Sequence, residues 1–83
     1  MLVKRCYDPK GLEPGGFYRS VPVYMVLSQG EGYLFQLKAS RGRIWRIEQR
    51  LGEIPWDLWE QFHLISWREL HPLIKEMVLD LVA

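Results

Sequence analysis

Hydrophobic and polar residues alternate along three stretches in the first half of the chain. The stretches are residues 17–28, 32–39 and 43–50, and the alternating apolar positions are Val21, Val23, Met25, Leu27, Tyr33, Phe35, Leu37, Ala39, Trp45 and Ile47. A period of two residues is typical of β-strands that bury one face. The pattern predicts an antiparallel three-stranded meander, and residues 1–7 form a further short predicted strand.

The alternation also predicts the turns between these strands. Three-residue loops at residues 29–31 and 40–42 keep every apolar position on one face of the sheet, and the second loop places Leu37 opposite Trp45. A two-residue loop would place Leu37 opposite Arg46, against the apolar pattern. Because a slip of one residue moves every side chain to the other face, we favour the longer loops.

In the last third of the chain the apolar period changes to that of a helix. Pro55 suits a first helical position and predicts a helix over residues 56–63. A capping-box pattern predicts a helical turn over residues 66–70. Pro72 ends that turn, because proline disfavours a helical residue before it, and an apolar stripe predicts a second helix over residues 72–82.

These elements predict one α+β domain spanning residues 1–83. Its sheet part, residues 1–50, is an antiparallel meander of three to four strands. Its helical part, residues 53–83, packs on one face of that sheet. The main alternative is a small SH3-like or roll-like barrel closed by the C-terminal helices.

Composition places the chain among globular proteins, since 48% of its 83 residues are apolar and 25% are charged. Cys6 is the single cysteine, so no disulfide can form within the chain. A secreted protein of this size normally carries disulfides, so we expect a cytoplasmic protein. No stretch has the length of a membrane span or the pattern of a signal peptide, and no membrane partner is expected.

The predicted register turns the even-numbered strand residues away from the helices. Four of these are Tyr24, Val26, Leu34 and Ile44, and lysine and arginine surround them. A fully solvated face seldom carries so many apolar groups, so these four residues are candidates for binding a protein partner or a second copy of the chain. The alternative is that the sheet curls, or the N-terminal loop folds over, and covers them within one molecule.

Charge is divided unevenly along the sequence. Residues 1–50 hold nine basic and four acidic residues, and residues 51–83 hold two basic and six acidic ones. The basic residues gather on the predicted hairpin 38–50, as Lys38, Arg41, Arg43, Arg46 and Arg50. Such a cluster is a candidate site for nucleic acid or an acidic partner. We expect the acidic half to lie on the solvent side of the helices, away from this hairpin.

No motif indicates an enzyme, a metal or a cofactor. The glycine-rich segment 8–16 lacks the Gly-Lys-Ser/Thr of a phosphate loop. His63 and His71 do not combine with Cys6 at a metal-site spacing. The tryptophan-rich segment 56–67 could dock a partner, but its apolar spacing favours a role in the core.

The sequence therefore favours a small non-enzymatic protein–protein interaction module, such as an adaptor, an inhibitor or a homodimeric accessory protein. The first alternative is a nucleic-acid-binding protein that uses hairpin 38–50. The second is a small ribonuclease whose scattered catalytic residues leave no motif.

Overall fold

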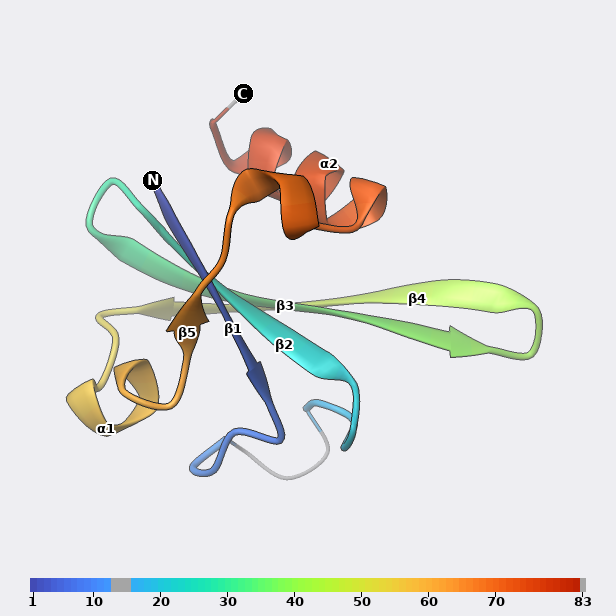
Figure 1. The fold of residues 1–83 in the computed structure, drawn as a ribbon, viewed down its shortest axis with the longest axis horizontal. Helices are drawn as coiled ribbons and strands as arrows, with labels where there is room; N and C mark the ends of the chain where they lie inside the picture. Colours follow the sequence, from blue (N-terminus) through green and yellow to red (C-terminus); the bar gives the residue numbers. More distant parts are fainter. Residues whose placement is uncertain (13–15, 83) are drawn as a thin grey trace.

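The computed structural model describes residues 1–12 and 16–82, which form a five-stranded antiparallel sheet with one helix packed on each face (Figure 1). The strand order is β4-β3-β2-β1-β5. This arrangement confirms the predicted α+β fold, in which a meander is followed by a C-terminal helix packed on it. In chain order the elements are β1 (Leu2–Tyr7), β2 (Pro22–Ser28), β3 (Glu31–Ser40), β4 (Arg43–Gly52), α1 (Trp56–Trp59), β5 (His63–Leu64), the 3₁₀ turn η1 (Trp67–Glu69) and α2 (Pro72–Val82).

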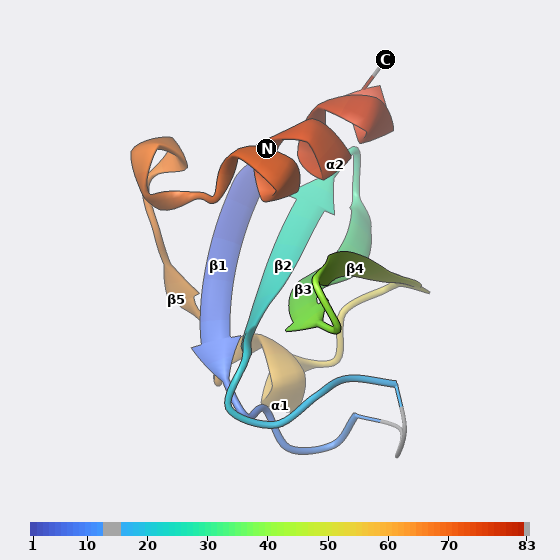
Figure 2. The same cartoon turned by 90° about the vertical axis from the view of Figure 1, so that its right-hand side faces the viewer.

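Both faces of the central strands are buried, each by a different part of the chain. On one face, here called the α2 face, the core residues are Val3, Tyr24, Val26, Phe35, Leu70, Ile74, Met77 and Val78. On the other, the α1 face, they are Val23, Met25, Leu34, Leu58 and Phe62. Figure 2 shows α2 near the top of the molecule and α1 near the bottom, well apart. The two helices therefore cover opposite faces of the sheet.

The turns of the meander are shorter than predicted. Gln29-Gly30 and Arg41-Gly42 are two-residue loops whose residues all have positive φ, from 53° to 77°. This is the type I′ geometry that matches the twist of a hairpin, and glycine adopts its second position without strain. Leu37 consequently lies opposite Arg46, and the predicted pairing with Trp45 is wrong. The prediction assumed one buried face, whereas strands buried on both faces leave the phase of the apolar alternation undetermined.

Strand β2 begins at Pro22, later than the predicted start at residue 17, because a side chain holds the preceding segment. The fully buried Gln36 amide accepts a hydrogen bond from Tyr18 N–H at 2.8 Å. Its Nε2 donates to Tyr18 O and Val21 O, both at 2.9 Å. The segment is thus fixed against the α1 face without joining the strand ladder.

Helix α1 ends at Trp59, four residues before its predicted end. The N–H groups of Gln61 and Phe62 bond to carbonyls three residues earlier, at 3.2 Å, which tightens the helix end. The Gln61 side chain donates to Asp57 O at 3.1 Å and satisfies a terminal carbonyl. The chain then extends into β5, a short strand that was not predicted, where His63 pairs with Arg5.

The predicted break at Pro72 is confirmed, since η1 ends before it and α2 begins at it. Ser66 N–H donates to the Glu69 carboxylate at 3.0 Å, as the capping-box pattern requires. His71 caps α2, because its Nδ1 accepts a hydrogen bond from Leu73 N–H at 3.0 Å. The apolar stripe of α2, formed by Ile74, Met77 and Val78, covers the α2 face of the sheet.

Candidate functional site

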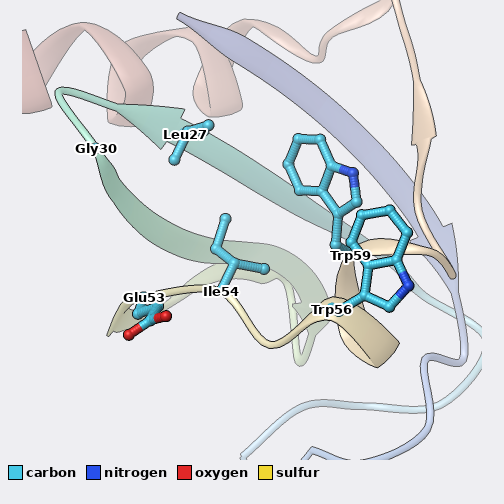
Figure 3. A pocket seen from close by; sticks show the side chains of 6 residues that line it. All are labelled: Leu27, Gly30, Glu53, Ile54, Trp56 and Trp59. Carbon is cyan, nitrogen blue, oxygen red and sulfur yellow. The ribbon is translucent and has the colours of Figure 1, made fainter.

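An open apolar groove of about 270 Å³ lies on the α1 face, between α1 and the β2–β3 turn (Figure 3). It is lined by Leu27, Gly30, Glu53, Ile54, Trp56 and Trp59. The two indoles come from the same turn of α1, and Trp56 is 70% exposed. An exposed tryptophan beside apolar neighbours is unusual, because the indole is normally buried except where it contacts a partner. We call this site the tryptophan groove.

Local sequence explains how the tryptophan groove forms. A Cβ atom on Gly32 would collide with the Ile54 side chain, so glycine at this position lets Ile54 pack directly on β3. Pro55 starts α1, and its carbonyl accepts hydrogen bonds from Leu58 N–H and Trp59 N–H at 3.1 and 2.9 Å. Leu58 points into the core, which leaves Trp56 on the outer side of this single turn.

Trp59 is held in place by Lys4, a buried lysine on β1. Lys4 Nζ lies 3.8 Å from the centre of the Trp59 ring and donates to Trp59 O at 2.9 Å. Burial lowers the pKa of Lys4, because the charged ammonium loses water. The cation thus fixes one wall of the tryptophan groove from beneath.

The second exposed feature is the end of the β3–β4 hairpin, which projects beyond the rest of the molecule (Figure 1). The register places Trp45 opposite Lys38 and Arg43 opposite Ser40. Lys38 Nζ lies 5.0 Å from the centre of the Tyr18 ring, and Tyr18 and Trp45 are each 50% exposed. Because side chains alternate along a strand, these groups share the α1 face. We call Tyr18, Lys38, Arg43 and Trp45 the hairpin platform.

The five predicted basic residues divide between the two faces of the hairpin. Arg46 and Arg50 lie on the α2 face, where Arg46 Nη2 is 3.1 Å from the Glu76 carboxylate and Arg50 pairs with Glu31. Among the described residues, Lys38, Arg41 and Arg43 form no ion pair. The expected separation of the basic hairpin from the acidic helix is therefore wrong at Arg46, which joins the hairpin to α2.

Ion pairing at the β2–β3 turn changes the titration of the groups involved. The hydrogen bond from Arg50 lowers the pKa of Glu31, and a second one from Tyr33 OH at 2.9 Å adds to this effect. The same hydrogen bond raises the pKa of Tyr33. Arg50 is thus engaged within the chain.

The four residues predicted as an apolar contact surface do not form one. Tyr24 and Val26 are buried on the α2 face, whereas Leu34 is buried on the α1 face. Ile44 is 52% exposed, and it lies on the projecting hairpin away from the other three. The predicted register had placed Val26 beside Leu34, and the shorter turn separates them. Tyr24, Val26 and Leu34 are instead covered by other parts of the same molecule, which is the alternative given in the sequence analysis.

Of the residues that line the tryptophan groove, only Trp56 and Trp59 were considered from the sequence as a possible docking surface, within the segment 56–67. Proline at residue 55 followed by tryptophan at positions 56 and 59 marked a short helix with both indoles on one side. That signal did not reveal that Trp56 remains exposed. Tyr18 was missed as well, because its position depends on the side chain of Gln36.

The remaining candidate groups for chemistry are dispersed. Burial raises the pKa of the Cys6 thiol, with a further contribution from Asp8, which disfavours the reactive thiolate. Across residues 1–12 and 16–82, no three histidine, cysteine, aspartate or glutamate side chains gather into a group that could hold a metal ion. Neither helix in that part of the chain is long and apolar enough to cross a membrane.

Comparison with models of known protein families gives no match, and no curated protein or solved structure is significantly similar to the chain.

Proposed function

We propose that the chain is a small non-enzymatic protein-interaction module, and that the tryptophan groove receives an apolar side chain of its partner. The observation that carries this proposal is the 70% exposure of Trp56 beside Leu27, Ile54 and Trp59. Tryptophans set in apolar pockets are among the side chains that dominate binding free energy at protein interfaces. Covering this indole would bury a large apolar area.

The size and rim of the groove indicate the chemistry of the partner. A volume of about 270 Å³ lies at the lower end of small-molecule pocket volumes and leaves room for one or two side chains of a partner. Glu53 lies on the rim and is exposed. A leucine, isoleucine or aromatic anchor with a neighbouring lysine or arginine therefore fits the site best.

A second copy of the chain would supply the apolar anchor but not the basic neighbour, because residues 53–60 hold three acidic residues and no basic one. In a two-fold arrangement each molecule would offer the same surface to the other, so Trp56 of one copy could enter the groove of its mate. We further propose that the module acts in the cytoplasm, where its single cysteine stays reduced.

A peptide-display selection against the folded chain tests the proposal. We expect enriched peptides to carry an apolar anchor beside a basic residue, and their binding to change tryptophan fluorescence. Trp56→Ala should weaken the selected peptides at least ~30-fold, as expected for a central aromatic contact. Light scattering over a range of concentrations tests the self-associating form, which Trp56→Ala should convert to a monomer.

Trp67→Ala is the matched control, because Trp67 is also partly exposed but packs near Lys75 of α2. It should leave peptide binding and the measured mass unchanged. The proposal is wrong if selection enriches nothing over the Trp56→Ala chain while the wild-type mass stays that of a monomer at every concentration.

A further inference from the structure

We infer that the hairpin platform binds single-stranded nucleic acid, at a surface separate from the tryptophan groove. The platform combines two half-exposed aromatic rings with cations on one face of a projecting two-stranded ribbon. Aromatic rings stack on unpaired bases, and neighbouring cations hold the phosphates that link those bases.

The position of Lys38 is the first argument, because this one cation neighbours both aromatic residues. Lys38 faces Trp45 across the ladder, and its Nζ lies over the Tyr18 ring at 5.0 Å. Two consecutive bases could stack on Trp45 and Tyr18 once the Lys38 ammonium moves from the Tyr18 ring to the phosphate between them. Arg43 extends the same face toward the turn, where Arg41 is exposed.

The platform is also prepared before any ligand binds. The buried Gln36 amide fixes the Tyr18 backbone through two hydrogen bonds, at 2.8 and 2.9 Å. The type I′ turn at Arg41-Gly42 continues the ladder to Ser40 and Arg43, so the ribbon stays regular to its end. Preorganised side chains lose less conformational entropy on binding than flexible ones.

The charge of the hairpin favours nucleic acid over a protein as the ligand of the platform. Residues 38–46 include four basic side chains and no acidic one. Arg46 turns to Glu76 on the α2 face, so the cations left for a ligand lie on the α1 face and at the turn. A duplex would leave the rings unused, because its bases are already stacked. A single strand uses both the rings and the cations.

The test is fluorescence anisotropy with a labelled single-stranded 12-mer of mixed sequence, and a duplex of the same sequence for comparison. We expect the single strand to bind more tightly than the duplex. Three phosphate contacts predict a slope of about −2 in log affinity against log salt, or a loss of roughly 20-fold between ~50 and ~200 mM salt. Failure to bind at ~50 mM salt would overturn the inference.

Substitutions separate stacking from general charge. Trp45→Ala removes the stacking ring and should weaken binding of the single strand by roughly 5- to 150-fold. Trp45→Phe keeps an aromatic ring and should retain most of the wild-type affinity. Arg43→Gln should reduce the salt slope by about 0.7, the contribution of one phosphate contact. Arg50→Gln removes the same charge on the opposite face and should leave the slope unchanged.

Two further outcomes would contradict the inference. Equal effects of Arg43→Gln and Arg50→Gln would show attraction to net charge rather than to the platform. Displacement of the oligonucleotide by polyglutamate at equal charge concentration would assign the surface to an acidic protein. Trp56→Ala should leave oligonucleotide binding intact, which distinguishes failure of this inference from failure of the proposed peptide site.

Discussion

Lys4 occupies a position where lysine is rarely found, beneath Trp59 in the core of the α1 face. Its ammonium donates to Trp59 O at 2.9 Å, and that carbonyl also accepts a hydrogen bond from Phe62 N–H at 3.2 Å. Removing the lysine would therefore leave no carbonyl without a partner. The residue serves to hold the Trp59 indole and is not required to satisfy the backbone.

We expect Lys4→Met to fold as stably as the wild type at pH 7, or more stably by up to about 1 kcal/mol, because a buried charge is replaced by an apolar group of similar length. The stability difference should depend on pH in a defined direction. The pKa of Lys4 is lowered in the folded chain, so above that pKa, and up to about 10.5, the unfolded chain binds more protons than the folded one. Wild-type stability should therefore rise relative to Lys4→Met as pH rises through this window.

Urea unfolding of both chains between pH 7 and 11 measures this difference. Comparison with the variant cancels the titration of groups common to both chains, including Tyr33, whose raised pKa acts in the opposite direction. A stability difference that stays constant, or falls, across the window would show that Lys4 is not titrating in a buried site.

At the scale of elements, α2 depends on a cap made by histidine. His71 Nδ1 accepts from Leu73 N–H, and His71 O accepts the first helical hydrogen bond, from Lys75 N–H, at 3.0 Å. Histidine is not among the preferred capping residues, yet its ring nitrogen takes the place of the usual side-chain oxygen. Since α2 covers the α2 face, this cap bears on the stability of the whole domain.

We expect His71→Ala to lower the free energy of unfolding by about 1 kcal/mol, and His71→Asp to retain the wild-type value, because aspartate restores an acceptor at the cap. Chemical denaturation monitored by circular dichroism gives these values. His63→Ala is the control, because His63 is exposed on β5, and it should change stability by less than about 0.5 kcal/mol. Equal losses for His71→Ala and His71→Asp would show that the ring packs rather than caps.

The elements also show what the sequence could and could not predict. Capping and proline signals near Ser66 and Pro72 located η1 and α2, because those signals act within a few residues. The register of the meander could not be predicted, because both faces of the central strands are buried. Val26 lies on the α2 face and Leu34 on the α1 face, and the apolar alternation alone does not show which residue lies on which face. Strand β5 escaped prediction because its two residues gain their conformation only by pairing with β1.

At the scale of the molecule, the tryptophan groove and the hairpin platform share the α1 face but lie at opposite ends of β3. Gly32, which packs against Ile54 of the groove, and Lys38 of the platform are six residues apart, or about 20 Å along an extended strand. In the sequence, the cluster of basic residues was the only feature that marked the hairpin as a candidate binding site. Only the folded chain separates the paired arginines, Arg46 and Arg50, from the cations that face outward.

This distance predicts that the two proposed sites bind independently. A selected peptide should bind the chain with the same affinity, within about twofold, whether or not the platform holds a six-nucleotide single strand, because sites with no shared residues are usually additive. Calorimetric titration of the peptide into the free and the oligonucleotide-saturated chain measures the two affinities. Mutual exclusion of the two short ligands would mean that they compete for one surface.

Strand β4 forms one edge of the sheet, and along its ten residues it pairs with β3 alone among the strands of the described residues. An edge of this length invites pairing with the same edge of another molecule and growth into aggregates. Arg46, Glu48 and Arg50 fall at alternate positions along it, and charged side chains at such positions discourage that pairing. We therefore expect these residues to limit edge-to-edge association of the chain, and a variant that neutralises all three together to aggregate more readily than the wild type in light scattering.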